Sequence, residues 1–222
     1  MEPRVKAVVS TFALTLLTLA FVPKLHADVI IRNGFGPFCT TPDCGFPIAG
    51  ENLGDQSEAV AFTPSANYTV TGAAAELINT FQNTTVNFFI YSNSAGLPGV
   101  PLGELGTATL AAGQQGEFSV GAADSISLVA NTEYWLVLTP GDNLTAVLWD
   151  QGGLISVPYE TSDSADISGW TSTGFPANSQ FEVDGTRTVT TTATPEPASA
   201  WLLLTGFGLA GLMYRRRLNW SL

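Results

Sequence analysis

Tyr134-Trp135-Leu136-Val137-Leu138 is an unbroken run of aromatic, aliphatic and β-branched residues. A second run of the same character is Phe88-Phe89-Ile90-Tyr91. Strands with one face in water alternate apolar and polar residues, whereas strands buried on both faces are apolar throughout. Both runs are therefore predicted to be central strands, and they make an all-β domain the first expectation for this chain.

Shorter runs of similar composition lie on both sides, from Asp28 to about Gly185, and Gly, Pro, Asn and Asp separate them. No stretch of this region carries a sustained helical period with caps, although residues 73–78 are ambiguous. About ten short antiparallel strands close most simply into a β-sandwich of the jelly-roll type, which is the predicted fold. The predicted strands are residues 29–32, 59–62, 73–81, 86–91, 105–110, 117–120, 126–129, 133–138, 146–149 and 180–183.

The middle of the chain is strongly acidic. The 222 residues carry a net charge of −11, yet residues 28–194 hold 17 acidic residues and only two basic ones, Arg32 and Arg187. Such a surface repels phosphate backbones, so nucleic acid is excluded as an expected partner. The charge serves solubility and mutual repulsion, or it attracts divalent cations and basic partners.

The N-terminal segment has the order of a secretory signal peptide. Arg4 and Lys6 precede an apolar run over residues 7–22, and the small residue Ala27 follows just before Asp28. This order predicts a signal helix that is removed by cleavage between Ala27 and Asp28. A retained signal anchor is the alternative, and it is less favoured because the run is short for a bilayer span.

A second apolar segment lies near the C-terminus. Residues 198–214 carry no charge, and their 17 positions are at the lower limit for a helix that crosses the hydrocarbon core. Arg215, Arg216 and Arg217 follow directly, and a basic cluster favours the cytoplasmic side of a membrane. The segment is therefore predicted to be a single transmembrane helix with the β domain outside.

The residues before this helix make the tail specific. Pro195-Glu196-Pro197, the glycine-bearing apolar segment and the arginine cluster together resemble the PEP-CTERM sorting signal of Gram-negative bacteria. The resemblance implies that Pro195, Glu196 and Pro197 are recognised by an exosortase, a membrane protease or transpeptidase that processes the tail over residues 195–218. It also implies export across the inner membrane, a single-pass intermediate, and a final place at the cell surface or outside the cell. The plain alternative is a permanent membrane anchor after a proline-rich stalk.

The middle domain, residues 28–185, also resembles a family. The stretches that carry the likeness are Asn33-Gly34-Phe35-Gly36, Ala59-Val60-Ala61-Phe62-Thr63, residues 86–92 with Gly96-Leu97-Pro98-Gly99, and residues 128–138. Together they resemble the choice-of-anchor domains of bacterial surface proteins, in particular the R type. This family has no assigned activity, so the resemblance implies none. The threonine-rich residues 186–194 follow as an expected stalk, either a bare spacer or a carrier of O-glycans.

Cys39 and Cys44 are the two cysteines of the chain. Because the signal peptide implies an oxidising compartment, a local disulfide that closes a small loop is predicted. A structural zinc site needs further Cys or His ligands, and a C-x-x-C redox motif has a shorter spacing.

The mature domain lacks the side chains of most catalytic sites. The only histidine, His26, is expected to leave with the signal peptide, and both lysines precede it in the sequence. This excludes His-based triads, His-ligated metal centres and lysine Schiff bases. The protein is therefore predicted to be non-enzymatic and to need no cofactor.

The carboxylates of Asp and Glu remain as candidate catalytic or metal-binding groups. A glycoside hydrolase would need two of them across one cleft, and Glu133 and Asp150 stand beside aromatic residues. A calcium site needs several oxygen ligands, for which Asp163 and Asp166 are candidates. The simpler expectation is that the acids cap turns and face water. The further acids considered for calcium are Asp142, Asp150, Glu182 and Asp184.

Two tryptophans have different expectations. Trp135 lies in an apolar run and is expected in the core, whereas Trp170 lies in a polar stretch and is the candidate for stacking on a sugar ring. The leading hypothesis is a non-enzymatic surface or biofilm-matrix protein. The alternative is a carbohydrate-binding module for exopolysaccharide, with calcium as an aid, and a glycoside hydrolase is the third hypothesis.

Overall fold

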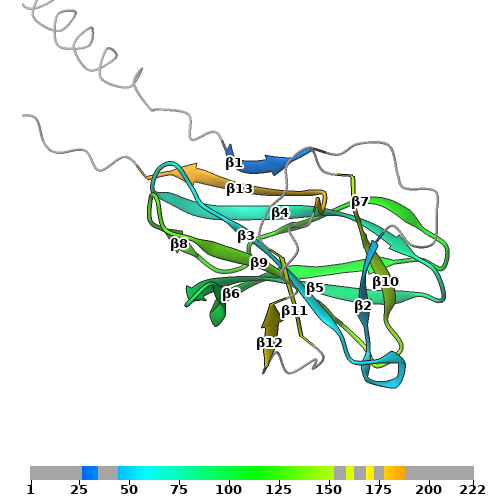
Figure 1. The fold of residues 1–222 in the computed structure, drawn as a ribbon. Coiled ribbons are helices and arrows are strands. Elements are labelled where there is room, and N and C mark those ends of the chain that lie inside the picture. Colours follow the sequence, from blue (N-terminus) through cyan, green and yellow to red (C-terminus); the bar gives the residue numbers. More distant parts are fainter. Residues whose placement is uncertain (1–26, 35–44, 153–158, 163–168, 173–177, 189–222) are drawn as a thin grey trace, which may run out of the picture. The chain divides into compact units, whose positions relative to one another are not determined.

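The computed structural model describes residues 27–34, 45–152, 159–162, 169–172 and 178–188. These residues form 13 strands and one short 3-10 helix, η1 (Glu51–Leu53), and the paired strands are antiparallel (Figure 1). The all-β prediction is confirmed for this part of the chain. The signal helix before Ala27 and the transmembrane helix over residues 198–214 are predicted for segments outside it.

Within the described ranges, no helix is long and apolar enough to cross a membrane.

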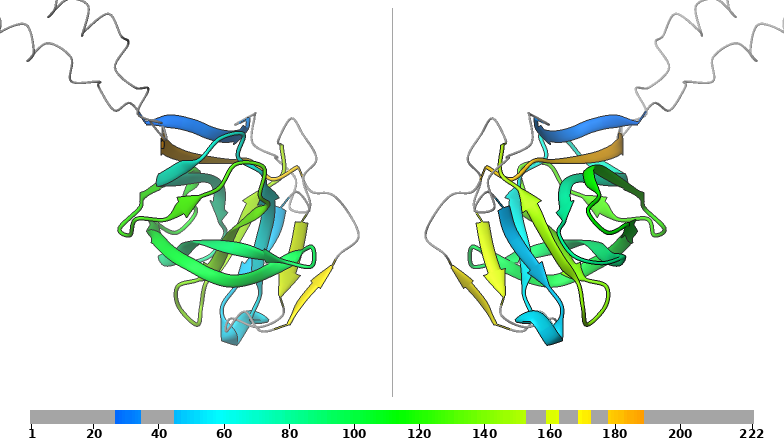
Figure 2. Two further views of the ribbon diagram at one scale, coloured as in Figure 1. Left: turned by 90° about the vertical axis from the view of Figure 1, so that its left-hand side faces the viewer. Right: turned by 90° about the vertical axis from the view of Figure 1, so that its right-hand side faces the viewer.

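The strands form two sheets that face each other (Figure 1 and Figure 2). In the seven-stranded sheet the order is β1 (Asp28–Asn33), β13 (Phe181–Arg187), β4 (Tyr68–Asn79), β10 (Ala146–Asp150) and β2 (Gly45–Ala49), and β7 (Gln115–Gly121) and β8 (Ser127–Leu128) also pair with β4. In the six-stranded sheet the order is β12 (Trp170–Ser172), β11 (Tyr159–Ser162), β3 (Ser57–Phe62), β9 (Tyr134–Pro140), β5 (Thr84–Ser94) and β6 (Leu97–Leu110).

Eight of the strands follow the strand order of a jelly roll. Numbered along the chain, β2, β3, β4, β5, β6, β7, β9 and β10 pair in the order 1-8-3-6 in one sheet and 2-7-4-5 in the other. The first and last strands, β1 and β13, extend the first sheet beside β4, and β11 and β12 extend the second beyond β3. The predicted β-sandwich is therefore confirmed. Five strands are added to the eight, because the short strand β8 also pairs with β4.

The core lies between the two sheets because alternate side chains of each strand point inward. On the six-stranded sheet, β5 and β9 contribute Phe88 and Leu136, which are fully buried. The opposite sheet contributes Trp149 and Phe181, whose ring centroids lie 6.4 Å apart in an edge-to-face arrangement. Burying each of these side chains stabilises the fold by roughly 1.5–3 kcal/mol.

The intervening residues of the same strands form a second apolar layer on the outer face of the six-stranded sheet. Tyr91 and Trp135 are almost completely buried there, together with Val137. The two runs that are apolar throughout are thus interior strands with both faces covered, as predicted. The cluster consists of Ala59, Ala61, Tyr91, Trp135 and Val137, with Phe89 and Trp170 packed against it.

Strands β2, β11 and β12 were not expected, and β6 begins at Leu97, well before the predicted residue 105. Prolines explain part of this difference. Pro47 stands in β2 and Pro98 and Pro101 in β6, and both strands end the order of their sheets. A proline is tolerated in an edge strand, because its missing N–H faces no partner. Three register shifts between β5 and β6 absorb the irregular backbone.

Candidate functional site

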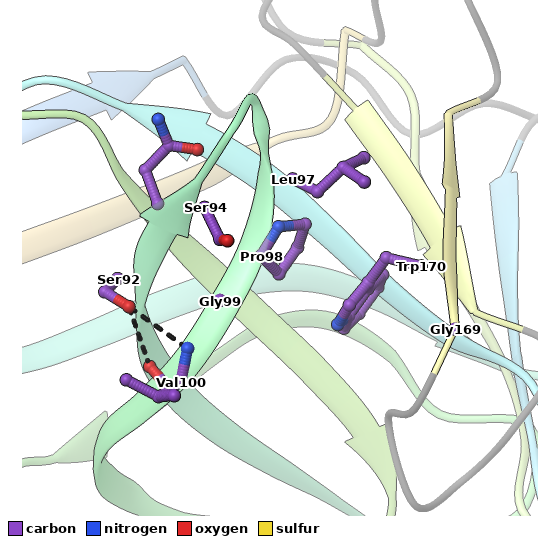
Figure 3. A pocket seen from close by; sticks show the side chains of 9 residues that line it. Ser92, Ser94, Leu97, Pro98, Gly99, Val100, Gly169 and Trp170 are labelled. Atoms are coloured by element: carbon purple, nitrogen blue, oxygen red, sulfur yellow. Dashed lines mark hydrogen bonds between the residues drawn. The ribbon is translucent and has the colours of Figure 1, made fainter.

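A pocket of about 620 Å³ opens at the tip of the β5–β6 hairpin (Figure 3). Residues 92–94 end β5, residues 97–100 begin β6, and Gly169 and Trp170 come from the start of β12. Strands β6 and β12 end the six-stranded sheet on opposite sides, yet their Cα atoms approach within 8 Å. The pocket therefore lies where the two edges of one sheet meet. Its lining residues are Ser92, Asn93, Ser94, Leu97, Pro98, Gly99, Val100, Gly169 and Trp170.

Trp170 forms one wall of the pocket and is half-buried. Its indole packs against the outer cluster of Tyr91 and Trp135, and Figure 3 shows it across from Leu97 and Pro98. Strand pairing fixes the backbone as well, because Trp170 lies opposite Ser162 of β11. The ring is thus held in place before any ligand arrives.

The opposite wall is a tightly built hairpin tip. Ala95 and Gly96 form its two-residue turn, and both have positive φ, 56° and 85°, as a type I′ turn requires. Ser92 Oγ accepts a hydrogen bond from Val100 N over 3.1 Å and donates one to Val100 O over 3.3 Å. The Ser92 hydroxyl therefore closes the hairpin and is committed to the protein.

Asn93 is a polar residue of the same wall, and one end of its amide has no hydrogen-bond partner among the described residues. Its Oδ1 accepts hydrogen bonds from Trp135 Nε1 at 3.3 Å and from Gly96 N at 3.1 Å. These two donors fix which side of the amide points inward, so the Nδ2 end points away from them. Asn93 is exposed and lines the pocket, which leaves its amide N–H donors accessible to a bound molecule.

The composition of the lining sets what the pocket can do chemically. None of its nine residues is Asp, Glu, Lys, Arg or His. The lining offers an aromatic wall, aliphatic surface, hydroxyls and an amide, which suit an uncharged, partly apolar ligand. None of these nine residues carries a carboxylate, imidazole or amine that could serve in general acid–base catalysis.

Acidic side chains gather on the outward-pointing side of the seven-stranded sheet, because they alternate along the strands with residues of the core, and two of them, Glu76 and Asp150, are buried there. Burial raises the pKa of Glu76, and the charges of Asp150 and Glu117 raise it further. Burial also raises the pKa values of Glu182 and Asp184. We call the group Glu76, Glu117, Asp150, Glu182 and Asp184 the acidic face.

Arg32 Nε lies 3.1 Å from Glu182 Oε2, so one of the two basic residues of the domain is placed at this face. Within the described part of the chain, no group of three or more His, Cys, Asp or Glu residues is placed to hold a metal ion.

The sequence candidates for chemistry are not brought together. Glu133 precedes β9 of the six-stranded sheet, whereas Asp150 is in β10 of the other sheet and accepts a hydrogen bond from Gln180 Nε2 at 2.9 Å. Neither lines the pocket. Asp142 caps a turn, as expected of the surface acids, because its Oδ1 accepts a hydrogen bond from Leu144 N at 2.9 Å.

The remaining predicted residues lie partly inside and partly outside the described ranges. Ala27 is exposed and Asp28 is the first residue of β1, so both sides of the expected cleavage point are described. The residues outside are the calcium candidates Asp163 and Asp166, the cysteines Cys39 and Cys44, the tripeptide Pro195, Glu196 and Pro197, and Arg215, Arg216 and Arg217.

Trp170, the candidate of the sequence for a sugar contact, lines this pocket. Asn93 and Ser94 were missed, because their position opposite Trp170 depends on a contact between distant parts of the chain. The available signal was local, a Ser-Ala-Gly turn after an apolar strand, and it indicated only a hairpin.

The family described as the PEP-CTERM protein-sorting motif matches residues 193–217. The match covers the predicted tripeptide, the uncharged segment and the arginine cluster, and it supports exosortase-dependent sorting of a surface protein. No curated protein sequence matches the chain.

Proposed function

We propose, on the premise that residues 193–217 carry a PEP-CTERM sorting motif, that the chain is a non-enzymatic protein of the cell surface or biofilm matrix. The motif supports export and sorting, and it follows the sandwich closely, since β13 ends at Arg187. The sandwich is then the part that is delivered. The sequence resemblance of residues 28–185 to the choice-of-anchor domains agrees with this proposed surface role.

The proposed route has two membrane steps in a Gram-negative cell. The signal peptide is removed between Ala27 and Asp28, and the uncharged residues 198–214 then hold a single-pass intermediate in the inner membrane. The arginine cluster keeps the end of the chain on the cytoplasmic side. The exosortase processes the tail near Pro195 and releases the domain to the surface.

Mass spectrometry of the protein recovered from the cell surface tests this route. We expect a C-terminus near Pro195 and an N-terminus at Asp28. The variant Glu196→Ala should accumulate in the membrane with its C-terminus at Leu222, because the recognition tripeptide is broken. Thr192→Ala, which lies just before the matched residues 193–217, is the control and should be processed normally. Surface protein that ends at Leu222 in the unchanged chain would falsify the proposal.

A second candidate function is a carbohydrate-binding module. The observation that favours it is Trp170 in a pocket with uncharged polar groups. We also propose that calcium, bound by Asp163 and Asp166, assists this carbohydrate binding. A glycoside hydrolase gains no support from the pocket, because no carboxylate lines it.

A further inference from the structure

We propose that the pocket between the β5–β6 hairpin tip and Trp170 binds an uncharged sugar residue of a polysaccharide. One apolar face of the ring packs on the Trp170 indole, and its hydroxyls bond with Asn93 Nδ2 and Ser94 Oγ. The inference deepens the second candidate function above and rests on it, by naming the site, the contact residues and the ligand charge.

The aromatic wall carries the first step. A pyranose ring has an apolar C–H face and a polar rim, so it is matched by a fixed aromatic ring next to hydrogen-bonding groups. The Trp170 indole meets this need, because the cluster of Tyr91 and Trp135 and the pairing with β11 hold it in place. Such pre-organisation lowers the entropic cost of binding.

The polar groups carry the second step. Asn93 Oδ1 is already used by Trp135 and Gly96, so the amide presents donors only. The Ser94 side chain also lines the pocket and adds a hydroxyl that both donates and accepts. A sugar hydroxyl can accept from the amide and exchange either kind of bond with the serine.

Two buried donors beside the pocket point the same way. Trp170 Nε1 and Tyr91 Oη are buried and have no hydrogen-bond partner among the residues that the structure describes. Tyr91 belongs to the apolar cluster behind the pocket wall, and Trp170 packs against that cluster. Buried donors of this kind are commonly satisfied by ordered water or ligand atoms, and a hydroxyl-rich ligand with its water supplies such acceptors.

Charge decides the class of sugar. No basic side chain lines the pocket, and residues 28–194 contain 17 acidic residues against two basic ones. A uronate or sulfated sugar would meet repulsion without a compensating partner. An uncharged sugar is neither attracted nor repelled by the negative charge of the domain, so neutral polysaccharides are the expected ligands.

Affinity electrophoresis of the full-length chain in mild detergent tests the proposal. The neutral probes in the gel are laminarin, galactomannan, dextran and hydroxyethylcellulose, and the anionic probes are alginate and polygalacturonate. We expect at least one neutral probe to retard the chain and neither anionic probe to do so. The proposal is overturned if no neutral probe retards it, or if an anionic probe retards it as strongly.

Three variants locate the site. Trp170→Ala should weaken binding by about tenfold or more, because the apolar surface that a sugar buries on the indole contributes at least about a tenfold gain in affinity. Asn93→Asp keeps the acceptor oxygen for Trp135 and Gly96 but removes the amide donors, so binding should fall while the fold stays intact. Phe81→Ala removes an aromatic side chain that is 62% exposed and outside the pocket, and it should bind like the unchanged chain.

The outcome for each variant is decisive. Unchanged binding by Trp170→Ala, or by a folded Asn93→Asp, overturns the site. Loss in both variants with retention in Phe81→Ala supports it. If the tail is processed near Pro195 but no probe binds, this inference fails and the sorting proposal stands. If the probe binds through Trp170 while the surface protein ends at Leu222, the sorting proposal fails and this inference stands.

Discussion

Trp135 donates its indole N–H to Asn93 Oδ1 over 3.3 Å. Trp135 is fully buried in the centre of the six-stranded sheet, whereas Asn93 is exposed at the rim of the pocket. The same oxygen accepts the Gly96 N–H of the hairpin turn. One amide oxygen thus connects the interior of the sheet, the turn and the pocket.

Replacing Asn93 by alanine should lower the free energy of unfolding by about 1–3 kcal/mol, because the buried Trp135 N–H loses its acceptor. Asn93→Asp retains an acceptor oxygen and should lose much less. Urea denaturation followed by tryptophan fluorescence measures both. Equal stability of the two variants would show that the bond to Trp135 contributes nothing.

Gly72 and Gly121 are opposite each other in the β4–β7 pair, yet they differ in the space around them. A Cβ at Gly72 would lie 2.6 Å from Val120 O, whereas a Cβ at Gly121 would have its nearest neighbour, Thr71 O, at 4.0 Å. Gly72→Ala should therefore cost about 1–3 kcal/mol through forced backbone shifts. Gly121→Ala should be neutral or stabilising by up to about 1 kcal/mol.

Thermal unfolding of the two glycine variants, measured side by side, gives the comparison. Because the substitution is the same in both, differences in chain entropy cancel to a first approximation. If Gly72→Ala is as stable as Gly121→Ala, the backbones of β4 and β7 can move apart to accept the new methyl group without loss of stability.

Glu76 makes stability depend on pH. Burial and the neighbouring charges of Asp150 and Glu117 raise its pKa in the folded state above the ordinary value of 4.5. The folded protein therefore binds the Glu76 proton more tightly than the unfolded chain does. The stability that this proton contributes is fully present below pH 4.5 and is lost as pH rises through the raised pKa. Glu76→Gln should be more stable than the unchanged chain near pH 7, and the difference should shrink toward about pH 4.5.

Unfolding free energies of both proteins from about pH 4.5 to 8 test this dependence. Glu104→Gln on β6, which is exposed and outside the acidic face, is the control for the loss of one carboxylate charge. A gap between Glu76→Gln and the unchanged chain that stays constant with pH would contradict the assignment.

Asp142 is expected to act in the opposite direction. Burial works to raise its pKa, but hydrogen bonds from Thr84, Leu144, Thr85 and Thr145 outweigh it and lower the pKa. Its contribution is therefore present above the unfolded value of 3.8 and is lost as pH falls through the lowered pKa. Asp142→Ala should cost about 1–2 kcal/mol at pH 7.

The Asp142→Ala cost should diminish at the acidic end of a pH series in urea denaturation. Asp124→Ala replaces an exposed acid on another loop and serves as the control for a general charge effect. Equal pH profiles for the two variants would remove the special role of the Asp142 turn.

The sequence predicted the parts of the fold that depend on local composition. The Phe88–Tyr91 and Tyr134–Leu138 runs became interior strands because apolar side chains at every position require cover on both faces. Strand β2 was missed, because Gly45 and Pro47 are poor strand residues and only pairing with β10 makes the segment extended. Tertiary pairing overrides propensity most readily in such short edge strands.

The pocket could be predicted from the sequence only in part. Trp170 was identified from its polar surroundings, since a tryptophan among serine, glycine and threonine has few apolar neighbours in the chain. Its partners at the hairpin tip are more than 60 residues away in sequence, and they meet Trp170 because β12 and β6 approach each other in the folded protein. Nothing local to Asn93 encodes that meeting.

Strand β1 has β13 as its partner, with Asp28 opposite Gly185. An exported chain leaves the cytoplasm N-terminus first, so β1 is outside long before its partner. The seven-stranded sheet can close only after Arg187 has followed, when the sorting motif is itself about to reach the membrane. A chain interrupted earlier would present the bare edges of β1 and of the β13-facing side of β4, which are templates for aggregation. Completion of the seven-stranded sheet therefore has to wait for the residues up to Arg187, which directly precede the tail.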